Sequence, residues 1–218
     1  MNHTSENQSH TTPAGTDSSL AAGSCPALPA GIHTIRCVGD SITEGWGLED
    51  PVTLSWPSLL EKQLPGIRFE NYGSGGAAVQ SFLPNAWENT LAARVAFSRP
   101  ADLTLLFLGT NDAEQLTPRF GTEYRQLVKR LQTLGPVVAV IPPKTARPAL
   151  NRRLERIRQD ILTADIPVID LWNVFVPLAA DGMHPTALGQ QEIARHIACG
   201  LPRALGHCTP DCQDMTIH

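Results

Sequence analysis

The sequence predicts an α/β fold in which one parallel sheet is covered by helices. From residue 32 onward, short apolar runs alternate with amphipathic stretches, which is the pattern of repeated strand–helix–strand units. The run over residues 103–108 is apolar on both faces, as expected of a central parallel strand. Polar and glycine-rich segments follow the runs, at the sheet edge where such folds bind ligands.

Five apolar runs are expected to form the strands. The first two, over 35–38 and 67–72, each end at a glycine. The run over 103–108 comes next, and Pro142 and Pro143 end the run over 137–141. A shorter run over 167–171 completes the sheet. Each strand is followed by helical material, so the expected order is five repeats of strand and helix.

The helices are predicted from periodicity and from capping residues. Pro57 fits the first turn of a helix over 55–64, and helical residues are expected over 87–97. The final helix is expected over 186–199. The two clearest helices carry apolar stripes at i, i+3, i+4 and i+7: Tyr124, Leu127, Val128, Leu131 and Leu134 in one, and Leu150, Leu154, Ile157 and Ile161 in the other.

Composition excludes several classes of protein. The chain has 218 residues, of which 42% are hydrophobic and 17% charged, so it is neither a disordered chain nor a coiled coil nor a collagen-like fibre. The net charge is −4 and no block of Lys and Arg stands out, which argues against nucleic acid or an anionic membrane as partner. No apolar stretch approaches the roughly 18 residues of a membrane span. A soluble enzyme, a binding module and a structural partner remain.

The two ends of the chain differ from its middle. Residues 1–30 contain no Val, Ile, Phe, Tyr or Trp, so this stretch buries too little surface to offset its ordering entropy. We therefore expect a disordered leader over 1–31, one domain over 32–203 and a tail over 204–218. The leader lacks the basic and apolar regions of a signal peptide, which favours a cytoplasmic protein, or a secreted one if a signal has been removed.

The five cysteines give a weaker signal. Their odd number, without a signal peptide, favours reduced thiols, while a disulfide among Cys199, Cys208 and Cys212 stays open. Cys37 lies among apolar neighbours on the first strand and is expected to be an inert buried thiol. Cysteines and histidines near the C-terminus match no standard zinc spacing, so no metal and no cofactor are predicted.

The segments after the strands carry the residue types of nucleophilic acyl transfer. Ser41 follows the first strand at a sharp, glycine-flanked turn, and His184 lies before the last helix. A serine hydroxyl needs an adjacent base, for which His184 is the candidate. Asp181 lies three residues before His184, a spacing at which two side chains can share one side of a helical turn. Its carboxylate can then orient the imidazole.

Acyl transfer also needs donors for the oxygen anion of the tetrahedral intermediate. The backbone N–H groups of Ser41 and Gly76 and the side-chain amide of Asn111 are the candidates. Glycine fits position 76 because the backbone there must approach the reacting carbon closely. Each such donor is typically worth about 10²- to 10³-fold in turnover. Together the loops supply every role of an acyl-transfer site.

Four of these segments resemble the signature blocks of the SGNH (GDSL-type) hydrolases. They are residues 39–45 (GDSITEG), 71–76 (NYGSGG), 109–112 (GTND) and 181–185 (DGMHP). By this resemblance Ser41, Gly76, Asn111 and His184 are the four name-giving residues, Asp181 completes the triad, and Asp40 and Asn71 support the site. It covers residues 33–200 and implies a flavodoxin-like three-layer α/β/α sandwich with a central five-stranded parallel sheet. It also implies hydrolysis of esters or thioesters without metal or cofactor.

Other interpretations compete with parts of this one. Residues 73–78 (GSGGAA) match the dinucleotide fingerprint, but no strand end is present to place the acidic residue it requires. Asp112 is interpreted as a helix N-cap rather than a second catalytic acid. Trp46, Trp87 and Trp172 are expected in the core more than around an acyl pocket.

The expected function is a serine esterase that cleaves a short acyl group, acetyl-like, from a carbohydrate or another small polar molecule. An acyltransferase or a thioesterase on the same fold is the alternative within the enzymes, and a non-catalytic binding module is the alternative outside them. No nucleic acid and no membrane span are expected. The acyl group, the alcohol or thiol partner and the oligomeric state are left open by the sequence.

Overall fold

A five-stranded parallel sheet forms the centre of the molecule in the computed structural model, which describes residues 28–207. The strands are β1 (Thr34–Gly39), β2 (Arg68–Gly73), β3 (Leu103–Phe107), β4 (Val137–Ile141) and β5 (Val168–Asp170), in the order β2-β1-β3-β4-β5. Every predicted strand is present, with ends that differ by at most one residue. The order reverses between β1 and β3, and parallel sheets of this kind generally bind ligands at such a reversal.

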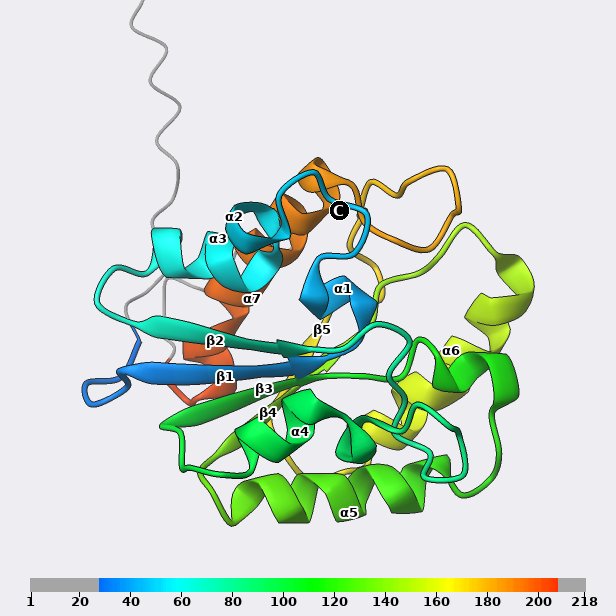
Figure 1. The fold of residues 1–218 in the computed structure, drawn as a ribbon, viewed down its shortest axis with the longest axis horizontal. Coiled ribbons are helices and arrows are strands. Elements are labelled where there is room, and N and C mark those ends of the chain that lie inside the picture. Colours follow the sequence, from blue (N-terminus) through cyan, green and yellow to red (C-terminus); the bar gives the residue numbers. More distant parts are fainter. Residues whose placement is uncertain (1–27, 208–218) are drawn as a thin grey trace, which may run out of the picture.

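Helices cover both faces of the sheet, so the three-layer α/β/α sandwich is confirmed (Figure 1). On one face lie α1 (Ser41–Glu44), α2 (Pro51–Leu54), α3 (Trp56–Gln63) and α7 (Ala187–Ala204). On the other lie α4 (Leu91–Ala96), α5 (Phe120–Gln132) and α6 (Pro148–Leu162).

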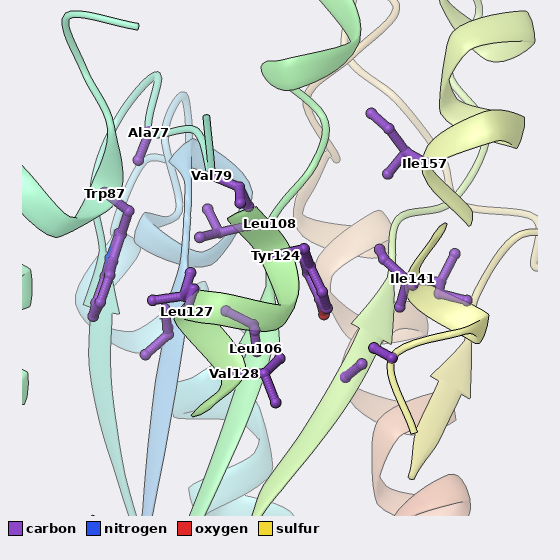
Figure 2. Packing of buried hydrophobic residues seen from close by; sticks show 14 of the residues in the cluster. Ala77, Val79, Trp87, Leu106, Leu108, Tyr124, Leu127, Val128, Ile141 and Ile157 are labelled. Carbon is purple, nitrogen blue, oxygen red and sulfur yellow. The ribbon is translucent and has the colours of Figure 1, made fainter. Parts of the chain in front are cut away.

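Each face of the sheet has its own apolar core. Tyr124, Leu127 and Val128 of α5 face the sheet beside Leu106 (Figure 2), and the stripe predicted for this helix is buried except for Leu134, which lies beyond its end. On the other face the fully buried side chain of Trp56 joins a cluster with strand residues and with α7. The sheet is therefore buried on both sides.

The helices differ from the prediction in three ways: one predicted helix is divided by a capping residue, two short helices are additional, and the last helix is longer. The segment expected to be helical over 87–97 is divided into a 3₁₀ turn, η1 (Trp87–Asn89), and α4. Thr90 divides them, because its side-chain oxygen accepts a hydrogen bond from the backbone N–H of Ala93 and so begins a new helix. The short helices α1 and α2 were not predicted, and α7 extends beyond residue 199.

The cysteines fall into two groups. Cys37 is a free, buried thiol, as predicted, and burial raises its pKa well above the usual value. Cys199, on α7, is disulfide-bonded, so reduced thiols are not the rule for this chain. Cys25, Cys208 and Cys212 lie outside the described residues, as do most of the predicted leader and tail.

Two findings concern membranes and metals. Over residues 28–207, no helix combines the length and apolarity needed to span a bilayer. Within the same range, no cluster of three or more His, Cys, Asp or Glu side chains is arranged to hold a metal ion. The predicted cytoplasmic location stays a prediction.

Candidate active site

Ser41 is the first residue of α1 and is separated from the end of strand β1 by Asp40 alone. The carboxylate of Asp40 caps this helix by accepting a hydrogen bond of 2.9 Å from the backbone N–H of Ile42. Gly39 permits the tight turn, because a Cβ atom there would lie 1.9 Å from the side-chain oxygen of Thr43. The strand therefore passes directly into the helix and presents Ser41 at the sheet edge.

Ser41, His184 and Asp181 form a continuous chain of hydrogen bonds. Ser41 Oγ lies 2.9 Å from His184 Nε2, and His184 Nδ1 lies 2.6 Å from Asp181 Oδ2. With Asp181 ionised, Nδ1 carries the proton that it donates to the carboxylate, and Nε2 accepts from the serine hydroxyl. The structure thus brings together the three residues proposed from the sequence, across 143 positions of the chain.

Asp181 is held by its own loop rather than by a helical turn. Its Oδ1 atom accepts from the backbone N–H groups of Met183 at 2.8 Å and His184 at 3.0 Å. Desolvation raises the pKa of this carboxyl, but the backbone and side-chain hydrogen bonds from His184 and the bond from Met183 outweigh it and lower the pKa to about 2. Asp181 is therefore a carboxylate over the whole neutral range.

The loop that precedes α6 also contacts the segment that contains Asp181. The guanidinium of Arg147 donates from Nη2 to the backbone oxygen of Asp181 at 2.9 Å, and also from Nε. The backbone N–H of Ala146 donates to the oxygen of Gly182 at 2.8 Å. Arg147 is distant from Asp181 in the chain and matches no motif, so sequence reasoning had no signal for it.

Two backbone donors near Ser41 have no acceptor within residues 28–207. These are the N–H groups of Ser41 and Gly76, and Gly76 has a φ of +72°, which favours glycine. The side chain of Asn85 donates to the backbone oxygen of Gly76 and fixes that peptide. The Ser41 N–H is at the start of α1, after β1, and the Gly76 N–H is in the loop after the adjacent strand β2.

The side chain of Asn111 ties the candidate oxyanion loops together. Its Nδ2 atom donates to the backbone oxygen of Ala77 at 2.9 Å and lies 3.5 Å from Asp40 Oδ2. Ala77 is adjacent to Gly76, and Asp40 is adjacent to Ser41. The three predicted donors therefore belong to one connected set of loops.

The two residues predicted to support the site both contact it. Asn71 donates from Nδ2 to the backbone oxygen of Thr43 at 2.7 Å, which holds α1 against β2. Asp40 is almost fully buried, and burial raises the pKa of its carboxyl to about 7. The hydrogen bond from Ile42 opposes this shift, while the nearby charge of Asp112 adds to it.

The interpretation of Asp112 as a helix cap is wrong. Asn111 precedes the 3₁₀ turn η2 (Asp112–Gln115), and Asp112 is inside it. The buried carboxylate of Asp112 instead accepts from the backbone N–H groups of Val79 and Gln80, at 2.9 and 2.8 Å. Its partners lie more than 30 residues away, so no local pattern indicated them. Asp112 thereby holds the loop that contains Gly76.

The three tryptophans considered for an acyl pocket have different environments. Trp87 and Trp172 are buried in the core, as expected. Trp46 is 55% exposed, and its ring lies over the imidazole of His184 with 4.3 Å between centroids. Sequence reasoning could not separate Trp46 from the others, because it follows α1 in a loop without periodicity.

Gln190 is a buried link that the sequence analysis missed. Its Oε1 atom accepts from the backbone N–H of Trp56 at 2.9 Å, and its Nε2 atom donates to the backbone oxygen of Ile42 at 3.0 Å. The residue is in the first turns of α7, shortly after His184. It connects the helix after His184 with the helix that carries Ser41.

The parallel three-layer sandwich is that of the SGNH hydrolases, a class of α/β enzymes. Residues 37–192 match the model of the GDSL-like lipase/acylhydrolase family, and the chain belongs to this family. The resemblance seen in the four sequence blocks is thereby confirmed.

Three known proteins illustrate the likeness. An acetylxylan esterase from Xylanibacter ruminicola is 26% identical over 175 residues, which are 79% of this chain and 36% of that protein. The chain therefore spans about a third of the length of this relative. A carbohydrate acetylesterase from Sinorhizobium meliloti superposes with a TM-score of 0.67 at 19% identity, and an aryl esterase from M. smegmatis with 0.66 at 20%. Each superposition covers 76% of this chain and 96% of the other, and shows the shared fold.

Proposed function

We propose that this SGNH hydrolase is a serine esterase in which Ser41, His184 and Asp181 form the catalytic triad. The observation that carries the proposal is the hydrogen-bond chain from the Ser41 hydroxyl through both imidazole nitrogens to the Asp181 carboxylate. This is the arrangement that activates a serine for attack on a carbonyl group.

The reaction follows from these positions. Ser41 Oγ attacks the acyl carbon while its proton passes to His184 Nε2, and the carbonyl oxygen becomes an anion that the free N–H groups of Ser41 and Gly76 and the Asn111 amide stabilise. The bond to the alcohol breaks as Nε2 gives the proton to the departing oxygen. Water then attacks the acyl-enzyme and passes a proton to His184 Nε2. As the bond between Ser41 Oγ and the acyl carbon breaks, Nε2 returns that proton to Oγ, and the acid is released.

We infer a short acyl group, acetyl-like, on a carbohydrate or another small molecule. The support comes from two relatives that are named an acetylxylan esterase and a carbohydrate acetylesterase. A series of p-nitrophenyl esters tests this part, with kcat/KM expected to fall from acetyl to octanoyl. A rise with chain length would contradict the short acyl group without affecting the triad.

The triad itself is tested by labelling and by turnover. Wild type is expected to react with a fluorophosphonate probe and to hydrolyse p-nitrophenyl acetate, whereas Ser41→Ala does neither. Ser98→Ala is the matched control, since this exposed serine lies just after α4 and, among residues 28–207, its hydroxyl bonds only to the backbone of Val95. Wild-type labelling or turnover in Ser41→Ala would refute the assignment.

A further inference from the structure

A cleft of about 270 Å³ opens beside His184. It is lined by Trp46 and the loop that follows it, by Leu54 of α2, and by Ala179, His184 and residues at the start of α7. Its ten lining residues include Trp46, Leu48, Glu49, Leu54, His184 and Pro185. None of the three candidate oxyanion donors is among them.

This placement identifies which half of an ester the cleft accepts. His184 Nε2 must deliver its proton to the oxygen of the departing alcohol, so that oxygen lies within hydrogen-bond distance of Nε2. The carbonyl oxygen points instead toward Ser41, Gly76 and Asn111. The group attached to the departing oxygen therefore leaves the reaction centre on the His184 side, where the cleft is.

The chemistry of the lining indicates the shape of that alcohol. Trp46 leaves more than half of its surface exposed although its ring is large and apolar, and Leu48, Leu54 and Pro185 add apolar surface. An exposed indole beside aliphatic side chains favours a flat ring with an apolar face. Glu49 also lines the cleft and disfavours an anionic alcohol.

We propose that this cleft selects the alcohol portion of the substrate and that Trp46 determines the preference for an alcohol with a flat apolar face, such as an aryl ring or one face of a pyranose. The inference depends on the proposed esterase function. It assigns alcohol specificity to the loop after α1 and the start of α7, separately from the acyl group.

The test compares esters that share an acetyl group and differ in the alcohol. Cyclohexyl acetate and ethyl acetate are compared first, because their alcohols have similar reactivity as leaving groups and only the first carries a ring. Phenyl acetate and an acetylated methyl pyranoside are then compared, to distinguish a preference for an aryl ring from a preference for a sugar. Trp46→Ala is expected to lower kcat/KM for the ring-bearing esters by about 10- to 100-fold, with little change for ethyl acetate. Trp46→Phe is expected to retain most of the preference. Loss of preference for only one of the two ring types identifies that ring as the alcohol selected.

The rate of deacylation distinguishes contact of Trp46 with the alcohol from an effect of Trp46 on the orientation of His184. The alcohol has left before water attacks, so hydrolysis of the acetyl-enzyme, measured after the burst with p-nitrophenyl acetate, is expected to be unchanged in Trp46→Ala. Leu54→Ala reaches the cleft without removing the contact between Trp46 and His184, and is expected to shift the preference in the same direction. Leu91→Ala, an exposed apolar side chain on α4, is the control.

Two outcomes overturn the inference. One is an equal loss for ethyl and cyclohexyl acetate, and the other is an equal loss in acylation and deacylation, because either shows that Trp46 acts through His184. If Ser41→Ala retains wild-type turnover, the esterase proposal fails instead. The two failures are therefore separable in one set of measurements.

Discussion

Asn111 combines two tasks that mutation can separate. One amide hydrogen holds the backbone oxygen of Ala77, and the amide nitrogen is also a candidate donor to the oxyanion. Asn111→Ala is expected to lower kcat for p-nitrophenyl acetate by about 10²- to 10³-fold, as the loss of one such donor does elsewhere. Fluorophosphonate labelling should persist, because Ser41 and His184 are unchanged. An unaltered kcat would exclude Asn111 from the oxyanion hole.

Asp40 should give the stability of the protein a dependence on pH. Its folded pKa of about 7 exceeds the value near 4 of an unfolded chain, so between these values the folded state binds more protons. The free energy of unfolding is then expected to fall as pH rises from 5 to 7, by up to about 1.4 kcal/mol per unit. Urea denaturation should show a smaller slope in Asp40→Asn.

Asp102 provides the control for this measurement. Hydrogen bonds from the backbone N–H groups of His33 and Thr34 lower its pKa, so its contribution to stability is present above pH 4 and is lost only as the solution becomes more acidic. Asp102→Asn should leave the slope between pH 5 and 7 unchanged. An unchanged slope in Asp40→Asn would contradict the assignment of the pH dependence to Asp40.

Tyr124 buries a hydroxyl that has no hydrogen-bond partner within residues 28–207, beside the aliphatic side chains of the α5 core (Figure 2). Burial raises the pKa of this phenol and makes the lone hydroxyl costly. Tyr124→Phe is expected to raise the free energy of unfolding by about 1 kcal/mol in chemical denaturation. Tyr72→Phe should lower it, because the Tyr72 hydroxyl contacts Glu70 and Arg99.

At the scale of elements, the position of α7 depends on one side chain. Gln190 joins α7 to the backbone of α1 and α3. Gln190→Leu removes both hydrogen bonds and leaves a buried N–H and a buried carbonyl oxygen without partners, which should cost about 2–4 kcal/mol. Gln191→Leu is the matched control, since the neighbouring glutamine is exposed. Equal thermal stabilities of the two variants would show that the hydrogen bonds of Gln190 do not hold α7 against α1 and α3.

The elements also show how far sequence reasoning extends. Strands and long amphipathic helices were predictable because their burial imposes a period on many residues, as along α5. The four-residue helices α1 and α2 were not, since each is shorter than two turns and has no period to detect. Ser41, Asp181 and His184 were found through local motifs. Arg147, Gln190 and the true partners of Asp112 were not, because their contacts join segments distant in the chain.

At the scale of the whole molecule, two cores share one sheet. Leu105 and Leu106 are adjacent on β3 and fully buried, yet they belong to opposite faces. Replacing either with Ala should lower the free energy of unfolding by about 2–5 kcal/mol. Because both faces depend on the same strands, each variant should still unfold in one transition, observed alike by circular dichroism and tryptophan fluorescence. Two separate transitions would show that the layers unfold independently.

The separation of Ser41 and His184 by 143 residues has a consequence for folding. The serine belongs to the first strand–helix turn, and the histidine precedes the last helix, so their hydrogen bond forms only when nearly the entire sheet has been assembled. A contact between residues so distant in the chain forms late, because the entropy lost in closing the loop between them must be offset by the pairing of the intervening strands. During refolding, reactivity of Ser41 toward a fluorophosphonate should therefore recover with the slowest structural phase, which makes the site a reporter of complete folding.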